Sequence, residues 1–497
     1  MGDGTEFDDA LLGLRGFRVV AVTEDGDELL VGIETIRRVA GCPSCGVIAR
    51  TKDRLRVIIR DLPAFNQRVW LVWSKRRFSC PDPDCPVQTW TERSDELPDR
   101  RVLSARAGRE CTRAVGQEAR SVASLARWLG VSWATVMSAV RDYGTPLVDD
   151  PGRVEEVTSL GIDETAFLKA NVEHPTMYVT GFVDLERRVL IDMIEGNRAI
   201  DVSRWLSSKD ESFLAGIKTV ACDLHEGYRS GLHPHLDHAR QVADPFHVVA
   251  AANRCVDHVR RRVQNELLGH RGRKDDPLYK IRRVLLTGAE RLNARGVDRM
   301  ALGLRLGDPD DEVLGAWLAK EYLRDVYLTD DPNEAAVLLD RVIAGCLADE
   351  VDEIVSLGNT LKHWRTQILA HHLTGASNGP TEAMNLLVKK IKRCGHGFKS
   401  FRNYRLRVLL HCGGIQLECS SGYDNAGPLA PVGRVEPLYL QGVGHVKLNV
   451  HRPLRGRPKT LTIRRRARRL EATVFCTGVP RAELAPTGKA IGRRGLS

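Results

Sequence analysis

The sequence lacks any apolar segment long enough to cross a bilayer, which takes about 20 consecutive apolar residues. Its first residues are acidic and lack the basic start and apolar stretch of a secretory signal peptide. Internal repeats are also missing, which argues against solenoid and propeller architectures. From these absences we expect a cytoplasmic protein without a membrane partner.

Cysteine is not spread along the chain as in a small disulfide scaffold, because four of the 12 cysteines lie before residue 90. The 497 residues are too many for one compact core and suggest roughly three or four domains. The formal net charge of +10 favours a polyanionic partner, because clustered Lys and Arg release counterions from nucleic acid. Solubility is the alternative explanation of that charge.

The clustered cysteines form two close pairs, Cys42 with Cys45 and Cys80 with Cys85, separated by a segment that can form a hairpin. Short spacing lets each pair bind a metal ion from one tight turn, and sulfur ligands in this arrangement suit tetrahedral Zn²⁺. Gly46 allows the backbone to turn beneath the metal. With sulfur at all four positions the site is closed and structural. The alternative is four unrelated buried cysteines.

Residues 122–143 have the pattern of a helix-turn-helix. Gly130 supplies the tight turn between the helices, and Ser132 is suited to cap the second helix. The exposed face of the second helix would offer four side chains to the major groove of DNA: Trp133, Thr135, Ser138 and Arg141. An ordinary helical hairpin is the alternative, but the turn chemistry and the basic charge together favour DNA binding.

Residues 157–247 show the order β-β-β-α-β-α-β-α, which is that of the ribonuclease-H-like fold. Strands are expected at 160–163, 177–183, 189–194, 218–222 and 240–243. Asp163 lies on the first strand and Asp223 ends the fourth, and these strands are neighbours in that fold. Glu382 falls in the first turn of a helix predicted for 380–393, which can pack beside them.

Three converging carboxylates can hold two Mg²⁺ (or Mn²⁺) ions about 3.5–4 Å apart. One ion activates the attacking oxygen, water first and then a 3′-hydroxyl, and the other stabilises the leaving oxygen. Because most acidic side chains are solvated surface residues, this prediction rests on Asp163, Asp223 and Glu382 standing in the right elements in the right order.

The helix that carries Glu382 also carries polar and basic residues. By their spacing, Glu382, Asn385 and Lys389 share one face. We expect this helix to contact DNA through Asn385, Lys389, Lys392 and Arg393. The alternative is an amphipathic surface helix that ends in a basic cluster.

Asp244 has two interpretations. It precedes Pro245 and a predicted helix, where an aspartate is a good N-cap. It also lies near the predicted metal site. The cap is the favoured interpretation.

These residues resemble the ISL3-type family of bacterial insertion-sequence transposases. The matching stretches are 161–164, 223 with 227–229, 242–249, 377–382 and 391–393. The cysteine ribbon and the helix-turn-helix also stand in the order that the family uses, and the resemblance covers about residues 35–414. It implies a DDE transposase with Asp163, Asp223 and Glu382 as its triad. It also implies a helical insertion between the second aspartate and the glutamate.

The implied activity is cleavage and joining of DNA strands at the terminal inverted repeats of the element. Its partners would be double-stranded DNA, as transposon ends and target, and further copies of the chain in a homodimer or higher oligomer at the nucleoid. The alternatives are a DNA-binding regulator that has the zinc ribbon and helix-turn-helix without catalysis, and an inactive transposase remnant.

The predicted fold class is therefore multidomain α/β. In chain order the expected parts are a zinc-ribbon domain (1–97), a helix-turn-helix domain (98–150), the first part of a ribonuclease-H-like core (155–255), an all-helical insertion (256–360), the last part of the core (361–414) and a loosely ordered basic tail (415–497).

Overall fold

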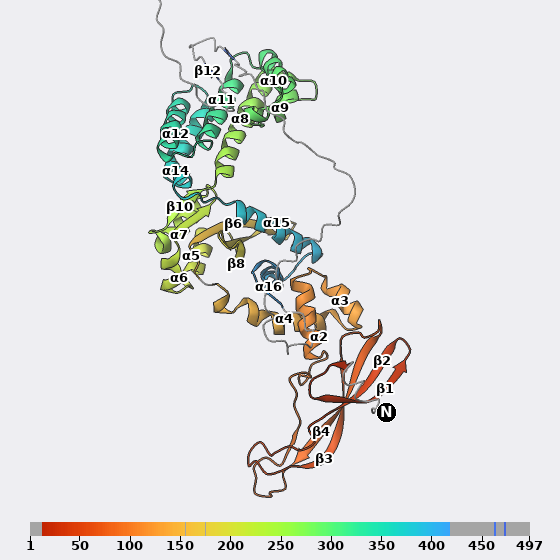
Figure 1. Cartoon of the computed structure of the whole chain (residues 1–497). Helices are drawn as coiled ribbons and strands as arrows, with labels where there is room; N and C mark the ends of the chain where they lie inside the picture. Colours follow the sequence, from red (N-terminus) through yellow and green to blue (C-terminus); the bar gives the residue numbers. More distant parts are fainter. Residues whose placement is uncertain (1–11, 155, 174, 418–461, 464–471, 474–497) are drawn as a thin grey trace, which may run out of the picture. The chain divides into compact units, whose positions relative to one another are not determined.

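The computed structural model describes residues 12–154, 156–173, 175–417, 462–463 and 472–473. Two compact units are present (Figure 1): the first takes in the chain up to Asp244 and again from Thr374, and the second takes in Pro245–Leu373. No described helix has the length and apolarity of a membrane span. Beyond residue 417 the predicted tail lies outside the described residues, except for the paired strands β11 (Thr462–Ile463) and β12 (Ala472–Thr473).

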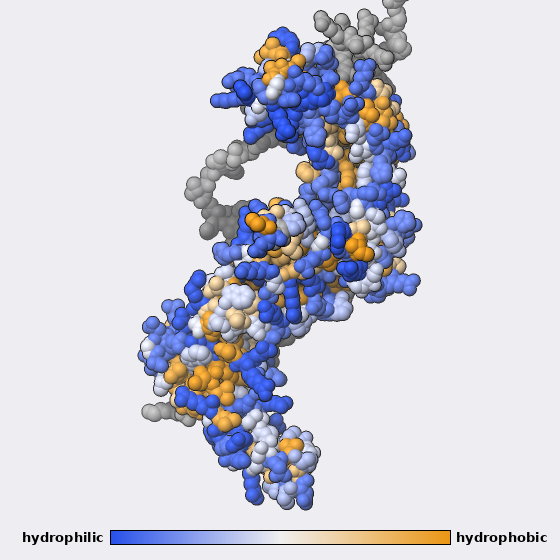
Figure 2. All heavy atoms as spheres, turned by 180° about the vertical axis from the view of Figure 1, so that it is seen from behind, coloured by the Kyte–Doolittle hydropathy of each residue, from blue (hydrophilic) through white to orange (hydrophobic). Residues whose placement is uncertain are grey.

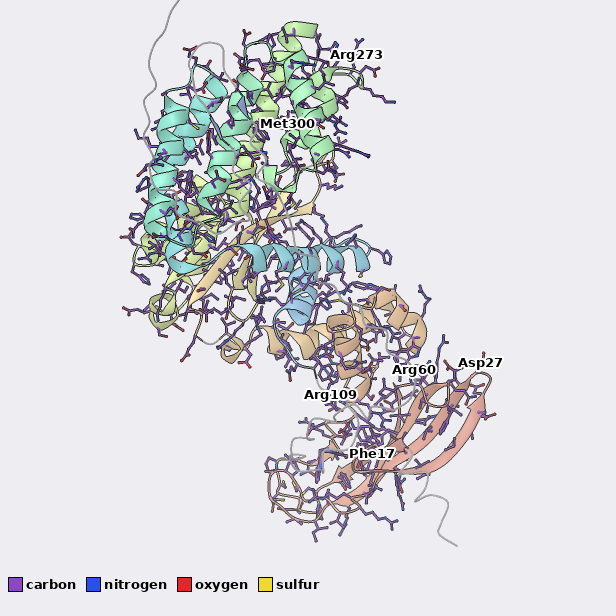
Figure 3. All side chains as sticks on the ribbon, turned by 45° about the horizontal axis from the view of Figure 1, so that its top comes forward. Phe17, Asp27, Arg60, Arg109, Arg273 and Met300 are labelled. Carbon is purple, nitrogen blue, oxygen red and sulfur yellow. The ribbon has the colours of Figure 1, made fainter. Side chains whose placement is uncertain are left out.

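A twisted sheet occupies the N-terminal part of the first unit. Its strands are β1 (Phe17–Asp25), β2 (Glu28–Thr35), β3 (Arg50–Arg60), β4 (Arg68–Ser79) and β5 (Thr89–Thr91). They lie in the order β1-β2-β4-β3, and β5 pairs with β4. Phe17, labelled in Figure 3, meets Trp73 edge to face with the ring centroids 5.5 Å apart. Both rings are buried in the core of this sheet, which fixes β1 against β4.

Several basic residues of this sheet are neutralised within the protein. The Glu34 carboxylate is buried and accepts hydrogen bonds from Arg18, from Arg54 at 2.7 Å and from Arg76 at 3.3 Å. Burial raises the pKa of Glu34, but the arginine hydrogen bonds outweigh it and the pKa is lowered overall. The exposed side chains of β1 include Val20 and Val22, and Figure 2 shows hydrophobic groups gathered over this end of the sheet.

Helices follow the sheet: α2 (Ala105–Gly116), α3 (Val122–Leu129), α4 (Trp133–Val148) and the short η1 (Pro151–Arg153). The predicted turn between α3 and α4 is confirmed, because Gly130 has φ 67° and ψ 37° in the left-handed region. Ser132 caps α4, and its hydroxyl accepts the backbone N–H of Thr135 at 3.1 Å. Leu125 and Val136 are fully buried between the two helices, as their spacing predicts.

The core sheet contains β6 (Ser159–Leu168), β7 (Met177–Asp184), β8 (Val189–Glu195), β9 (Thr219–Cys222) and β10 (Arg240–Ala243), in the order β10-β9-β6-β7-β8. β7 is antiparallel to β6 and β8, whereas β9 is parallel to both β6 and β10. This arrangement confirms the predicted ribonuclease-H-like core. β6 runs past its predicted end at residue 163, since Thr165 and Phe167 continue the alternation of buried side chains.

Helices cover both faces of this sheet: α5 (Ala199–Ser207), α6 (Glu211–Gly216), α7 (Glu226–Leu236), α15 (Gly379–Cys394) and α16 (Phe401–Cys412). On one face Ile162 packs in a core with Trp205 of α5. On the other, the Phe167 ring stacks on Tyr404 of α16 with centroids 5.1 Å apart. Successive side chains of a strand point to opposite faces, so Asp163 shares its face with Phe167 and with α15.

α16 joins the core sheet to the helix-turn-helix part. Arg405 donates to Asp192 of β8 at 2.7 Å and to Asp149, the residue after α4, at 3.0 Å. A Cβ added to Gly116 at the end of α2 would lie 2.9 Å from Leu410 Cβ, so these helices are in close contact. The helix-turn-helix and the core sheet therefore both pack against α16.

The second unit is helical: α8 (Pro245–Leu268), α9 (Pro277–Leu285), η2 (Ala289–Arg291), α10 (Ala294–Gly307), α11 (Glu312–Val326), α12 (Pro332–Leu347), α13 (Asp352–His363) and α14 (Arg365–Thr374). The insertion predicted for 256–360 is longer at both ends, because α8 is continuous from Pro245 and α14 ends only at Thr374. Met300 of α10, labelled in Figure 3, is buried in this unit.

Candidate active site and metal centre

Three aspartates stand side by side at one end of the core sheet. The register of β6, β9 and β10 aligns Ile162, Cys222 and Ala243 in one row. The residue that follows each of them is an aspartate: Asp163, Asp223 and Asp244. Neighbouring strands lie about 4.7–4.9 Å apart, so the register sets the backbones of these three aspartates side by side.

Glu382 joins this row from α15. Among the described residues, Glu382, Asp244 and His247 each place one possible ligand atom within 4.8 Å of the other two, in a group that does not include the predicted partners Asp163 and Asp223. Asp244 is only 3% exposed; its Oδ1 accepts the backbone N–H of Asn378 at 2.9 Å, and its Oδ2 is buried without a hydrogen-bond partner. A buried, unsatisfied carboxylate oxygen is costly, and a divalent cation would satisfy it.

Asp244 is therefore a candidate metal ligand, the second of its two interpretations, and its role as the N-cap of α8 stays a prediction. In the sequence Asp244 shares with Asp223 only its place directly after a strand of four residues, which is buried throughout in β9 but only at its last two residues in β10. The observed bond from Asn378 also ties Asp244 to the residue that precedes α15, and so to the helix that carries Glu382.

Asn385, predicted to contact DNA, is instead buried against β6. Its Nδ2 donates to Asp163 Oδ2 at 2.5 Å, and its Oδ1 accepts the Thr165 hydroxyl at 2.8 Å. Lys392, with the same predicted role, donates from Nζ to the Ala166 carbonyl at 2.8 Å. Both side chains point to the sheet because this face of α15 packs against β6 and is not exposed to solvent.

The other predicted contacts of α15 are unaffected. Lys389 and Arg393 are exposed, and they stay predicted DNA contacts. Glu164, the neighbour of Asp163 on β6, points to the opposite face of the sheet, where it accepts hydrogen bonds from Asn197 at 2.8 Å and from the Tyr228 hydroxyl at 3.3 Å.

The approach of α15 to β6 depends on Gly161. A Cβ at this position would overlap the hydroxyl of Thr381, which is buried in α15, and would lie 2.6 Å from Leu185 Cδ2. Thr381 is β-branched and cannot swing away easily. Only a residue without a side chain lets α15, which carries Glu382, pack this closely on β6.

We predict that Gly161→Ala displaces α15 and lowers the rate of DNA cleavage by about 100-fold, the usual order for a misplacement near 1 Å. Gly181→Ala on β7 is the control, because its added Cβ meets nothing closer than Leu190 Cδ1 at 3.4 Å. Nicking rates and circular dichroism of both variants test this. Equal rates in the two variants would contradict the importance of this contact.

The predicted DNA contacts of α4 differ in exposure. Trp133 is 50% exposed, while Thr135, Ser138 and Arg141 are half-buried. Arg141 Nε donates to Asn403 at 3.1 Å. Ser138 accepts from Arg101 at 3.4 Å. Their contact with DNA stays a prediction, and Trp133 offers the largest exposed surface of the four.

The four predicted zinc ligands come together. The Sγ atoms of Cys42 and Cys85 lie 3.6 Å apart and those of Cys45 and Cys80 lie 3.5 Å apart. All four sulfurs lie within 4.8 Å of one another. A tetrahedron with Zn–S bonds of about 2.3 Å has sulfurs about 3.8 Å apart, so the cysteines fit a structural Zn²⁺.

The pKa values of these thiols are shifted in opposite directions. The backbone N–H of Cys45 lowers the pKa of Cys42 to about 7. Burial raises the pKa of Cys80 to about 12. Thiolates packed this closely repel one another, and a divalent cation at their centre removes that repulsion.

Two family models match the chain. A model described as a transposase, of the DDE type named for ISL3, matches residues 160–408, and so contains the aspartate row, α15 and most of α16. A model described as the zinc finger of transposases IS204, IS1001, IS1096 and IS1165 matches residues 38–85, and so contains all four clustered cysteines.

Individual relatives are more distant. The chain is 25% identical over 290 residues to the transposase for insertion sequence element IS1557 from two strains of Mycobacterium tuberculosis; the match covers 54% of this chain and 63% of each relative. The chain thus spans less than two thirds of their length. The chain also has a low structural similarity to the Drosophila P element transposase strand transfer complex, with a TM-score of 0.32 at 13% identity over 64% of this chain and 94% of that one.

Proposed function

The chain belongs to the ISL3 family of transposases with a zinc ribbon, and on that premise we propose that it binds the terminal inverted repeats of an insertion sequence and catalyses metal-dependent strand cleavage and strand transfer. The observation that carries the proposal is the row of aspartates on β6, β9 and β10, with Glu382 brought beside Asp244 by α15. Carboxylate oxygens are the ligands that Mg²⁺ and Mn²⁺ prefer.

Asp163, Asp223 and Glu382 are the proposed catalytic triad, and Asp244 is a further candidate ligand. When bound, divalent cations would activate the attacking oxygen and stabilise the leaving oxygen of a phosphodiester. The contribution of this chain is to fix the ligands. Asn385 Nδ2 holds Asp163 Oδ2 at 2.5 Å and the backbone N–H of Glu164 holds Asp163 Oδ1 at 2.7 Å, so both oxygens of this carboxylate are fixed in orientation.

DNA would be held by groups on both sides of the carboxylates. The exposed Lys389 and Arg393 on α15 are proposed to contact the phosphates near the cut strand. The helix-turn-helix, with Trp133 on its second helix, and a Zn²⁺-stabilised ribbon are proposed to recognise the ends. Since an element has two ends, two or more subunits would be needed to pair them before joining to target DNA.

The direct test uses DNA that carries the ends of the element. Such ends are found in the flanking genomic DNA as inverted repeats bounded by short direct duplications. Purified protein, Mg²⁺ and this DNA should give nicks at the 3′ ends, followed by joined products. Retarded DNA without any cut product would instead favour a DNA-binding regulator or an inactive remnant, and would overturn the proposed catalysis.

A further inference from the structure

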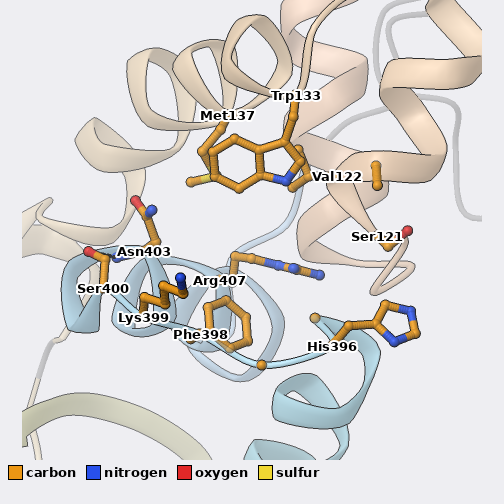
Figure 4. Close-up of a pocket in the computed structure, with 13 residues that line it drawn as sticks. Ser121, Val122, Trp133, Met137, His396, Phe398, Lys399, Ser400, Asn403 and Arg407 are labelled. Carbon is orange, nitrogen blue, oxygen red and sulfur yellow. Dashed lines mark hydrogen bonds between the residues drawn. The ribbon is translucent and has the colours of Figure 1, made fainter.

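A pocket of about 420 Å³ opens between the helix-turn-helix and the segment that follows α15. Figure 4 shows Trp133 and Met137 of α4 on one side and Phe398 on the other, with Arg407 of α16 between them. The volume falls in the range of about 300–1,000 Å³ that is usual for small-ligand sites. It has room for one nucleotide and not for a duplex, whose major groove alone is about 12 Å wide.

Arg407 brings a buried positive charge to this pocket. The residue is 3% exposed; its Nη2 donates to the Arg120 carbonyl at 3.1 Å, and its Nε is buried without a hydrogen-bond partner. Within the described part of the chain, no carboxylate forms an ion pair with Arg407. Burial lowers the pKa of this guanidinium, which is the expected cost of a charge without a counterion.

The other polar groups of the pocket also favour an anion. The residues that line it include the cations Lys399 and Arg407, together with His396, and no acidic residue. Val122 and Ala123, which begin α3, line the pocket as well. Their backbone N–H groups have no acceptor within the helix, and the start of a helix carries a partial positive charge.

Flat apolar surfaces complete the pocket. The Trp133 side chain is 50% exposed although it is large and apolar. The Phe398 ring lies 5.3 Å from the Arg407 guanidinium carbon, so it presents an aromatic face beside the charge. Aromatic faces next to cations are the usual features of proteins that bind unpaired bases.

We propose that this pocket binds a single unpaired nucleotide of a DNA strand, with its base against Trp133 and Phe398 and its phosphate against Arg407, Lys399 and the start of α3. The inference rests on the proposed function, because a strand must be opened near the carboxylates for cleavage and joining. It assigns to Trp133 the stacking of an unpaired base, and not only the reading of a groove.

The test is binding of a fluorescent pentathymidine strand, measured by anisotropy without divalent metal at fixed ionic strength, because salt changes such affinities strongly. We expect Trp133→Ala to weaken binding about 10-fold, the order that one stacked base contributes. The same variant should bind an abasic pentanucleotide as the unchanged chain does. Lys399→Ala should weaken binding of both strands.

The controls are matched in residue type. Trp128→Ala removes an exposed tryptophan of α3, and Arg402→Ala removes an exposed cation of α16; neither residue lines the pocket, and neither change should alter binding. Because Arg407 is buried and its replacement risks unfolding, the exposed Trp133 and Lys399 carry the test.

Three results would overturn the proposal. If Trp133→Ala weakens binding of a blunt duplex as much as binding of pentathymidine, Trp133 contacts a groove of the duplex and does not stack on an unpaired base. Displacement of the strand by inorganic phosphate as effectively as by thymidine monophosphate would show a phosphate site without a base. Free thymidine monophosphate competing as well as the strand would assign the pocket to free nucleotides. The assay measures binding without cleavage, so Asp223→Ala should bind pentathymidine as the unchanged protein does. A failure of the proposed catalysis would therefore not alter this result, and the two proposals are tested separately.

Discussion

Replacing Asp223 by alanine is expected to abolish strand cleavage at the ends of the element while leaving DNA binding intact. Asp223 occupies the centre of the aspartate row, between Asp163 on β6 and Asp244 after β10. Loss of this ligand would remove about 4 kcal/mol of charge stabilisation, which corresponds to about a thousandfold in rate. Nicked product resolved on a denaturing gel measures the rate, and band retardation measures binding.

The control for this prediction is Asp237→Asn at the end of α7. Its carboxylate is 79% exposed and lies outside the row, so cleavage should proceed at the ordinary rate. If Asp223→Ala still cleaves, Asp223 does not belong to the site. If Asp223→Ala loses both cleavage and binding, the substitution has damaged the fold and does not test the chemistry. The aspartate row would then be tested by Gly161→Ala and Asp244→Asn.

Cys42→Ser is expected to release Zn²⁺ and to weaken recognition of the ends. Structural zinc sites contribute about 10–16 kcal/mol of apparent binding energy to the fold that surrounds them. Cys42 is buried, and its Sγ lies 3.6 Å from that of Cys85, so serine cannot replace it without leaving the cation under-coordinated. Metal content per chain and affinity for end DNA are the measurements.

Cys346→Ser provides the comparison, since this buried thiol lies on α12 in the other unit and is no part of the cluster. It should keep the zinc content of the unchanged protein. A normal zinc content in Cys42→Ser would count against the ribbon. If Cys42→Ser loses zinc as expected but still binds end DNA as tightly as the unchanged protein, the ribbon has a structural role and does not recognise the ends.

Local features were predictable from the sequence because local chemistry determines them. Gly130 adopts the left-handed conformation that its turn needs, and Ser132 caps α4. The spacing of Cys42 and Cys45 anticipated a convergent cluster. The strands of the core followed from runs of buried residues, and their order then placed Asp163 beside Asp223.

Features that depend on the register of distant segments were not predictable. Asp244 enters the site because Ala243 pairs with Cys222 on β9, and no local pattern reports that register. Asn385 and Lys389 were expected to share an exposed face, but β6 covers Asn385 and leaves Lys389 in solvent. The charge of Arg407 could not be predicted to lack a counterion either, because this depends on which side chains the fold brings around it.

The helix α16 has a consequence for how a cut would be positioned. Its ion pairs to Asp192 and Asp149, and its contact with Gly116, pack the helix-turn-helix against the core sheet that carries Asp163. On the proposed function, this packing would set the number of base pairs between the recognised sequence and the bond that is cut. Inserting one base pair between them would move the scissile phosphate out of register, and the enzyme would cut the wrong linkage or none.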